Sequence, residues 1–466
     1  MADIRPFKAI YFNTSLTDLS RVVAPPYDVI DKSLQDELYK RSPNNIVRLD
    51  LNRESNPYPA AAAEMQRMLK EKVLVPDSEA SIYPYFQTFK TQDGPKVDDS
   101  RRVGLRPRRG STTPYGIVDR LVESSTTRRD PDLRRDKTVT RRGFVSWIKL
   151  EPFEAGVVLP HERTLSKPKE DRLNLMISTK ATFSQIFSLY GDQNKTLEKE
   201  YDKLKSTKSY LEADYDGVNN KIYRINDSAT IKTFQNLLSK LAVYIADGHH
   251  RYETALEYQR LMREKNPKHT GEEPYNFIMM YFTNIFDEGL VVYPTHRIIH
   301  SLSNFDSNKL VETVKTFFEL TPKSDVNALA SSLNSAGDYS FGMILPQKKY
   351  LLMKLKNSAD ILSVVKENVP APVKRLDVTL LHDYVLRQTL GISKEAQEKK
   401  LNINYTIDRH EVDNAIQLGK AHVGFILNST KVEQVREVAD AGAVMPQKST
   451  YFYPKLLSGV LLNGLE

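Results

Sequence analysis

The hydrophobic and polar positions of the first 90 residues predict a mixture of strands and helices. Short apolar runs at 5–12 and 81–89 are typical of strands, and the second is rich in aromatic residues. The alanine-rich stretch 58–74 has apolar residues at helical spacing and predicts a helix. Between these elements, the prolines of VVAPPYDVI exclude a regular helix and indicate a turn.

From residue 143 onward, apolar runs alternate with amphipathic stretches. Strands are expected at 143–151, 181–190, 220–227, 275–284, 288–300, 349–355, 402–408 and 422–428. Helices are expected at 195–217, 228–241, 306–320 and 430–442, and 242–266 reads as a strand, a turn and a helix. Strands interleaved with helices in this order predict a mixed α/β (α+β) fold.

Residues 91–136 interrupt this pattern. This stretch is rich in Arg, Ser, Thr, Pro and Gly and has little apolar periodicity, so it predicts an exposed, disordered insertion. A short turn could join the strands that flank it into a hairpin. We therefore divide the chain into an N-terminal α/β segment (1–90), the insertion (91–136), a core (137–300) and a C-terminal α+β domain (301–466).

Length and composition narrow the class of protein. A chain of 466 residues is too long for one ordinary domain, so two or three are expected. The absence of cysteine excludes disulfides, thiolate metal sites and cysteine nucleophiles. No apolar stretch approaches the ~18 residues of a membrane span, and the N-terminus lacks the apolar segment of a signal peptide. A cytoplasmic protein without membrane contact is expected.

The positive charge of the chain is concentrated in one place. The formal net charge is +8, and residues 91–142 hold 14 of the basic and 8 of the acidic side chains. The rest of the chain is close to neutral, which does not favour nucleic acid as a partner. The alternative is a protein that binds nucleic acid through the Arg-rich insertion. Its nucleic-acid binding would then depend strongly on salt and would disappear when the insertion is deleted.

The stretch ADGHHRYETALEY follows an apolar run and opens a helical pattern. A strand that turns through glycine into a helix leaves N–H groups free at the helix start, where the helix dipole also favours an anion. Four residues suited to phosphate binding occupy this start: Gly248, His249, His250 and Arg251. The preceding Asp247 would need a cationic partner such as Mg²⁺, arginine or a substrate ammonium group. The alternative is an ordinary helix start with Asp247 as its cap and solvated histidines.

The histidines do not favour a zinc site. Adjacent helical residues point ~100° apart, so His249 and His250 cannot easily share one ion. His296 and His300 fall in a predicted strand, where they would lie ~13 Å apart. A single carboxylate, Asp247, is therefore the metal-binding candidate, for Mg²⁺ rather than zinc.

ADGHHRYETAL resembles the phosphate-binding motif of the ParB/sulfiredoxin/free serine kinase superfamily and is most similar to that of the archaeal-type free serine kinase. Upstream, FVSWIKLEPFEAGVVLPHERTL has a strand that leads to Pro-His-Glu, as that kinase has, and there the glutamate is the catalytic base. Apart from 91–136, nearly the whole chain also resembles a bacterial family of unknown function, the DUF family numbered ten-fifteen. The shared stretches are RPF, APPYDV, PHE-T, ADGHHRYE, an LPTHR-like stretch and MP-KSTYFYPK.

The resemblance implies a ParB/free-serine-kinase-like, nucleotide-binding core at 137–300. It implies a phosphotransferase that uses ATP or ADP with Mg²⁺ and acts on a small hydroxyl-bearing metabolite, with free serine as a candidate. Glu162 would be the general base that deprotonates the acceptor hydroxyl, and Asp247 would orient Mg²⁺ or substrate. The alternative is a nucleotide-binding switch or scaffold without catalysis, and the test is whether Glu162 faces the phosphate site.

Further residues are candidates for ligand contact. The substrate-binding candidates are His161, Thr295, His296 and Arg297. Weaker candidates for the same pocket are Tyr27, Asp28, Lys448, Ser449 and Lys455, which packed turns would explain equally well. The donor nucleotide, the acceptor and the oligomeric state stay open.

Overall fold

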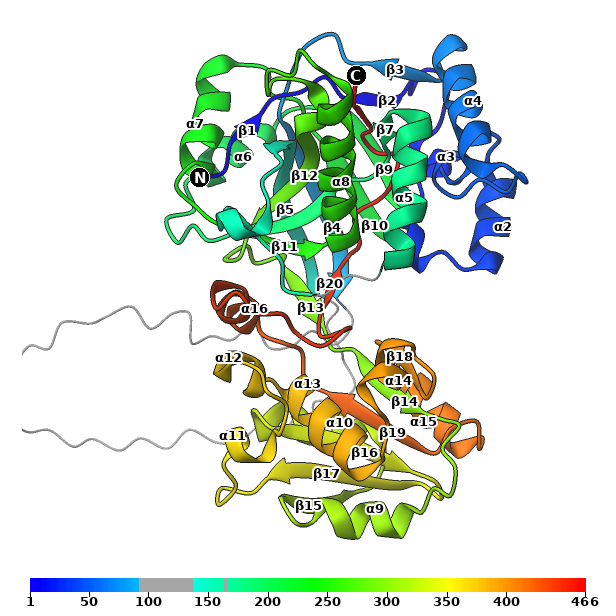
Figure 1. Ribbon diagram of the computed structural model, residues 1–466, viewed down its shortest axis with the longest axis vertical. Coiled ribbons are helices and arrows are strands. Elements are labelled where there is room, and N and C mark those ends of the chain that lie inside the picture. Colours follow the sequence, from blue (N-terminus) through cyan, green and yellow to red (C-terminus); the bar gives the residue numbers. More distant parts are fainter. Residues whose placement is uncertain (92–136, 163–165) are drawn as a thin grey trace, which may run out of the picture.

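The computed structural model describes residues 1–91, 137–162 and 166–466. Apart from Thr91, the Arg-rich insertion lies outside the described residues, and the expectation of disorder there stays a prediction. The described chain has two lobes, each built on its own sheet (Figure 1). The mixed α/β class is confirmed.

The larger sheet forms the first lobe and combines strands from the N-terminal segment and the core. Its spatial order is β6 (Val158–Leu159), β11 (Val243–Asp247), β8 (Ile186–Tyr190), β12 (Phe277–Asn284), β5 (Lys137–Lys149), β4 (Tyr83–Thr91), β10 (Val218–Ile222) and β9 (Leu211–Tyr215). β1 (Ile4–Arg5) pairs with β5. The pairs β11–β6 and β12–β8 are parallel, and the others are antiparallel.

The flanking strands of the insertion pair as expected. Thr91 at the end of β4 lies opposite Lys137 at the start of β5, and the antiparallel ladder continues to Tyr83 opposite Val145. β5 therefore begins six residues earlier than the apolar pattern indicated, because the first part of the strand carries polar side chains.

Helices cover both faces of the first sheet. They are α2 (Lys32–Arg41), α4 (Pro57–Lys70), α5 (Ser166–Thr179), α6 (Glu198–Leu204), α7 (Ser228–Leu238) and α8 (His249–Lys265). Two apolar clusters result, one containing Met65 of α4 and the other containing Phe234 of α7 and Tyr252 of α8. β12 is buried along its whole length, as its continuous apolar run predicts for a strand covered on both faces.

The smaller sheet forms the second lobe, and its neighbouring strands are all antiparallel. Its spatial order is β15 (Phe318–Lys323), β17 (Lys349–Leu355), β16 (Ser340–Leu345), β19 (Val423–Leu427), β14 (His296–Ile299) and β18 (Ile403–Thr406). Its longest α-helices are α9 (Ser307–Val314), α10 (Val326–Ala336) and α15 (Arg409–Gln417), with a further helical stretch over 377–389. β14 belongs to this sheet, although it lies within 137–300.

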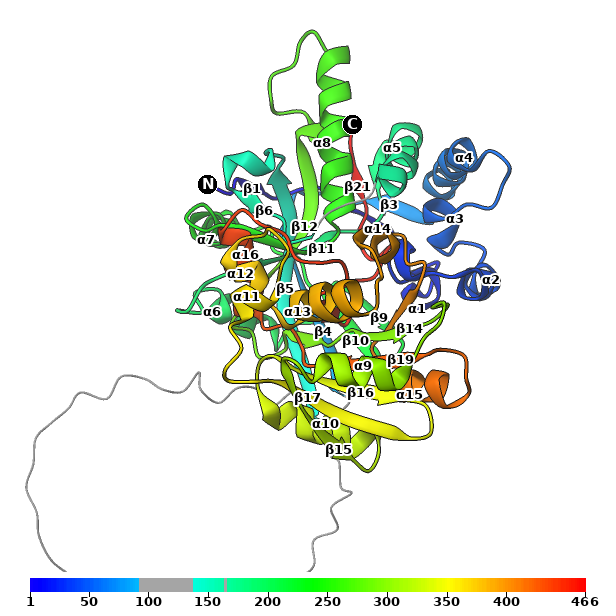
Figure 2. The same cartoon turned by 60° about the horizontal axis from the view of Figure 1, so that its bottom comes forward.

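The C-terminal segment returns to the first lobe. After α16 (Val432–Asp440), β20 (Tyr451–Tyr453) pairs with β13 (Val291–Tyr293) between the lobes, and β21 (Asn463–Gly464) pairs with β7 (Ala181–Thr182). Figure 1 shows this path as the red ribbon that rises from α16 through β20 to the C-terminus, and Figure 2 shows α16 and β21 from below. Within the described ranges, no helix has the length and apolar character needed to cross a bilayer.

Candidate functional site

The predicted strand, turn and helix over 242–266 are present as β11, a glycine turn and α8. Gly248 has φ = +96° and ψ = +28°, a left-handed conformation that glycine adopts without the strain a side chain would cause. A Cβ atom here would lie 2.9 Å from the Arg251 guanidinium. The glycine thus permits both the turn and the close approach of this arginine.

Residues 445–455, which we call the closing segment, lie across this turn. The Lys455 Nζ is 3.6 Å from Asp247 Oδ2 and 4.6 Å from the centre of the Tyr451 ring. The Met445 N–H donates to the carbonyl oxygen of His161 at 2.8 Å. A lysine and a tyrosine from the end of the chain therefore join a turn that lies some 200 positions earlier in the sequence.

Asp247 lies between two cations. Its Oδ2 is 3.5 Å from an Arg251 Nη and 3.6 Å from the Lys455 Nζ, and its side chain is 22% exposed. Burial alone would raise the pKa of Asp247, but the positive charges of Lys455 and Arg251 outweigh it and lower the pKa to about 2. The carboxylate is ionised at neutral pH and holds the two cations at the turn.

Arg251 has protein partners of its own. One Nη donates to Ser184 Oγ at 3.1 Å and to the Gln185 carbonyl oxygen at 2.5 Å, and the side chain is mostly buried. The guanidinium therefore lies beneath the turn instead of extending into solvent. Its charge still contributes to the potential at the helix start.

His161 and His249 form a buried pair. Their rings meet edge to face with centroids 4.7 Å apart, and the His161 backbone N–H donates to His249 Nε2 at 3.2 Å. Burial lowers the pKa of both imidazoles, so both are neutral near pH 7. The His161 ring also bonds the Ile245 carbonyl oxygen at 2.6 Å and Thr450 Oγ1 at 3.2 Å. The pair thus ties β11 to the closing segment, whereas the sequence indicated substrate and phosphate contact.

Glu162 faces the closing segment. Its Oε1 accepts a hydrogen bond from the Lys448 backbone N–H at 3.0 Å, and its backbone forms a parallel bridge with Met445. Within the described part of the chain, Oε2 accepts no hydrogen bond. Burial lowers the pKa of His250, on the first turn of α8, and the negative charge of Glu162 partly opposes that shift. Glu162 is therefore close enough to the start of α8 to act on its charge.

The N-terminal segment also reaches the site. Tyr27 begins the short 3₁₀ helix η1 (Tyr27–Val29), and the Arg172 guanidinium lies 4.3 Å above its ring. Burial raises the pKa of Tyr27 to about 12, and the charge of Arg251 opposes that rise. The exposed Asp28 acts on the pKa of His250 and Tyr451. The turn of the APPYDV stretch thus lies within electrostatic reach of the site.

The other three substrate-binding candidates are buried in the second lobe. Thr295 and His296 are 5% and 6% exposed, and Arg297 is 1% exposed. The His296 Nδ1 accepts a hydrogen bond from the Leu427 N–H at 3.2 Å, and burial lowers its pKa to about 3. Protein atoms cover most of these side chains. Their contact with substrate stays a prediction.

Arg297 supports the closing segment instead. One Nη donates to the Lys448 carbonyl oxygen at 3.0 Å, and its Nε donates to His382 Nε2 at 3.3 Å. On the first lobe, the buried Arg141 binds the same segment, because it donates to the carbonyl oxygens of Tyr453 and Pro454 at 3.2 and 2.6 Å. Two buried arginines, one from each sheet, therefore hold the closing segment by its backbone.

Other contributors have little or no local sequence signal. Tyr451 and Lys455 lie in the STYFYPK stretch, whose mixed aromatic and basic character is a weak sign of a site. Lys400 lies in a polar stretch without a motif, yet the charges of Lys448 and Glu162 act on its pKa, which burial lowers. Only the tertiary fold brings Lys400 to this place.

The residues of the site do not fit a resident metal ion. Asp247 is already paired with two cations, and the described residues contain no group of three or more His, Asp or Glu side chains able to hold a metal. A protein-held Mg²⁺ normally needs one or two free carboxylates together with substrate phosphates. The expectation that Asp247 binds Mg²⁺ therefore stays a prediction.

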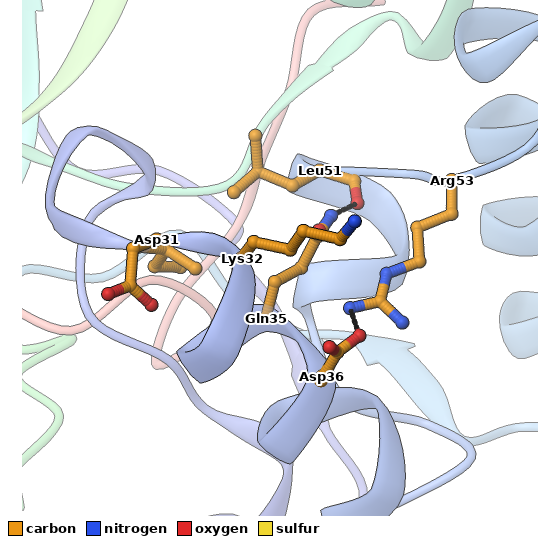
Figure 3. Close-up of a pocket in the computed structure, with 7 residues that line it drawn as sticks. Asp31, Lys32, Gln35, Asp36, Leu51 and Arg53 are labelled. Atoms are coloured by element: carbon orange, nitrogen blue, oxygen red, sulfur yellow. Dashed lines mark hydrogen bonds and ion pairs between the residues drawn. The ribbon is translucent and has the colours of Figure 1, made fainter.

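A separate cavity of about 480 Å³ lies at α2 (Figure 3). Two of its charged groups pair with each other, since an Arg53 Nη is 2.5 Å from Asp36 Oδ1. The Gln35 amide donates to the Leu51 carbonyl oxygen at 2.8 Å.

Fold and site define a two-lobed, mixed α/β protein with a cationic site where its lobes meet. The chain belongs to the DUF1015 family, described as a protein of unknown function, whose family model matches residues 4–105 and 128–379. The family expectation is confirmed, while a bacterial source stays a prediction. None of the curated proteins matches the chain.

Several solved structures are similar to the chain. A conserved hypothetical protein from Pyrococcus furiosus is 15% identical, with a TM-score of 0.33, over 67% of this chain and 92% of that one. A free serine kinase in complex with AMP is 14% identical, with a TM-score of 0.34, over 66% and 86%. SbnI with a C-terminal truncation, from Staphylococcus aureus, is 8% identical, with a TM-score of 0.28, over 67% and 85%.

Proposed function

We propose that the protein is a nucleotide-dependent phosphotransferase that acts on a small hydroxyl-bearing metabolite. The observation that carries the proposal is the convergence of the Gly248 turn, the closing-segment lysines and Glu162 in one site. The helix start and Lys455 would hold phosphate groups, and Glu162 would face the acceptor. Its resemblance to the Pro-His-Glu and Asp-Gly-His-His-Arg motifs of free serine kinase supports this assignment.

Electrostatics favours a polyphosphate at this place. Lys455 and Arg251 both approach the same oxygen of Asp247, and the dipole of the 17-residue helix α8 adds partial positive charge at its start. Asp247 holds both cations in place, but its single negative charge neutralises only one of their two positive charges. A nucleotide phosphate group at the turn would complete the charge balance.

The proposed chemical step needs a base and an in-line acceptor. The acceptor hydroxyl oxygen would form a bond to the terminal phosphorus, while the bond between that phosphorus and the nucleotide's bridging oxygen breaks. The hydroxyl proton would pass to Glu162, whose Oε1 is fixed by the Lys448 N–H and whose Oε2 would take the proton. The leaving nucleotide keeps the electron pair of the broken bond.

The test is phosphate transfer from radiolabelled ATP, and separately ADP, to a pool of small metabolites by the full chain with Mg²⁺. Glu162→Gln keeps the shape and an acceptor oxygen for the Lys448 N–H, but removes the base, so the transfer rate should fall ~10²–10⁴-fold. Nucleotide affinity should stay unchanged. Equal transfer rates in wild type and Glu162→Gln would remove Glu162 as the base, and binding without any transfer would favour a nucleotide switch.

A further inference from the structure

A second cavity, of about 690 Å³, lies on the second lobe beside β14, β18 and α15. Three lysines line it, and we call it the lysine cavity after them: Lys400, Lys420 and Lys448. They come from three separate segments, the turn before β18, the turn after α15 and the closing segment. The fold, not local sequence, therefore gathers their charges.

The lining of the lysine cavity is strongly positive. Within the described ranges, none of its three lysines forms an ion pair. Its one carboxylate, Glu411, accepts a hydrogen bond from the Thr406 hydroxyl. Unpaired ammonium groups around a concave surface attract an anion, and they repel one another without it. Burial lowers the pKa of Lys400 and the charge of Lys448 adds to that shift, while the charges of Glu162 and Asp28 partly oppose it.

The lysine cavity adjoins the proposed catalytic site through one residue. The Lys448 backbone N–H bonds Glu162 Oε1 at 3.0 Å, while the same residue lines the cavity. The carbonyl oxygen of Lys448 accepts a hydrogen bond from Arg297, which lies on β14. The next residue of β14, Ile298, also lines the cavity. A molecule seated in the cavity would therefore extend toward Glu162.

We propose that the lysine cavity binds an anionic group, phosphate or carboxylate, of the acceptor metabolite whose hydroxyl faces Glu162. The proposal rests on the phosphotransferase function and narrows its substrate to anionic hydroxyl compounds. The cavity belongs to the second lobe, so the first lobe would bind the nucleotide and the second lobe would select the acceptor. The closing segment would join the two halves of the site.

Inorganic phosphate and succinate are suitable probes, because they present the two anionic groups without a nucleotide. Binding is measured by calorimetry on the full chain. All variants carry Lys455→Gln, which weakens the nucleotide-phosphate site, so that the measured anion binding reports on the lysine cavity. The test variant adds Lys400→Gly and Lys420→Gln. Lys400 has φ = +55°, where glycine is the unstrained residue, so this change should not reduce thermal stability. Lys349→Gln, an exposed change on β17, is the matched control.

The variant that adds Lys400→Gly and Lys420→Gln is called the cavity variant. We expect it to bind at least one of the two anions at least about tenfold more weakly than the Lys455→Gln chain does. The control that adds Lys349→Gln should bind both anions as the Lys455→Gln chain does. The probe that responds identifies phosphate or carboxylate as the preferred group. Equal affinities in the cavity variant and the control, for both probes, would overturn the cavity proposal even if phosphate transfer is observed. Weaker binding in the cavity variant without any phosphate transfer would support an anion site and instead refute the phosphotransferase function.

Discussion

Gly248 determines the geometry of the proposed phosphate site at the scale of a single residue. Its left-handed backbone turns β11 into α8, and the absence of a Cβ admits the Arg251 guanidinium. That guanidinium bonds Ser184 and Gln185 while it faces Asp247. One glycine thus fixes the positions of the helix start and of both charged groups that flank it.

Gly248→Ala should lower the free energy of unfolding by more than the cost of placing an alanine in the left-handed conformation. A left-handed alanine costs about 1–2 kcal/mol, and the displaced guanidinium would weaken hydrogen bonds worth about 1 kcal/mol each. Gly271→Ala is the matched control, because Gly271 has φ = +95° and no atom lies within 4 Å of the place its Cβ would occupy. Urea denaturation measures both. An equal loss of unfolding free energy in the two variants would contradict the contact between the turn and Arg251.

Side-chain roles were the least predictable feature of the site. The sequence placed the Asp-Gly-His-His-Arg stretch at a strand-to-helix turn, because local periodicity and glycine determine such a turn. It did not show that His161, His249 and His296 are buried hydrogen-bond partners, since the groups that cover them come from distant segments. A histidine in a sequence carries no sign of its exposure.

At the scale of elements, local signals predicted β4, β5, β11, α8 and β12. Two errors share one cause, which is tertiary pairing that overrides helical spacing. The expected helix over 195–217 ends at Leu204, and β9 and β10 then pair around an Asp216–Gly217 turn with φ of +49° and +72°. The expected helix over 306–320 likewise ends at Val314, because β15 pairs with β17.

The β4–β5 pairing makes a prediction about the insertion. Thr91 and Lys137 are direct cross-strand partners, and Thr91 Oγ1 donates to the Lys137 carbonyl oxygen at 3.1 Å. An Asn-Gly turn in place of residues 92–136 should therefore close the hairpin without changing its register. We expect the melting temperature to stay within a few degrees of the wild-type value by calorimetry. Loss of the cooperative transition would show that the replaced residues are needed for folding.

At the scale of the whole molecule, the closing segment unites the two lobes. Arg141 and Arg297 hold its backbone from the two sheets, and the side chains of Leu456 and Leu457 beyond it pack in the core of the first lobe. No local pattern predicts this arrangement, because the partners are separated by 151 to 313 positions. The sequence motif MPQKSTYFYPK was visible, but its place in the fold was not.

Burial of neutral histidines makes stability depend on pH. Burial lowers the pKa of the partly buried His250 and of four buried histidines: His161, His249, His296 and His382. For His296 the folded-state pKa is about 3 and the ordinary value is 6.5, so the unfolded chain binds the extra proton between these values. The stability from each such histidine is complete above pH 6.5 and is lost as the pH falls below it.

Buried carboxyl groups act in the opposite sense. Burial raises the pKa of Asp287 to about 6 and of Asp377 to about 7, so these groups add stability as the pH falls. The free energy of unfolding therefore falls less steeply with falling pH than the buried histidines alone would cause. Replacing His296 by Gln should make the free energy of unfolding fall less steeply, by about 1.4 kcal/mol per pH unit between pH 6 and 4. Urea denaturation across that range measures the difference, and parallel curves would contradict a buried, neutral His296.

If the Gly248 turn and the closing segment form one nucleotide-phosphate site, the protein should bind ADP through Lys455, and calorimetric titration measures this binding. Lys455→Gln removes a cation beside the phosphates and leaves Asp247 less compensated, so affinity should fall about ten- to a hundredfold. Lys349→Gln removes one exposed positive charge elsewhere and should bind ADP as the wild type does. An unchanged ADP affinity in Lys455→Gln, or no ADP binding by the wild type, would show that the turn and the closing segment do not form a nucleotide-phosphate site.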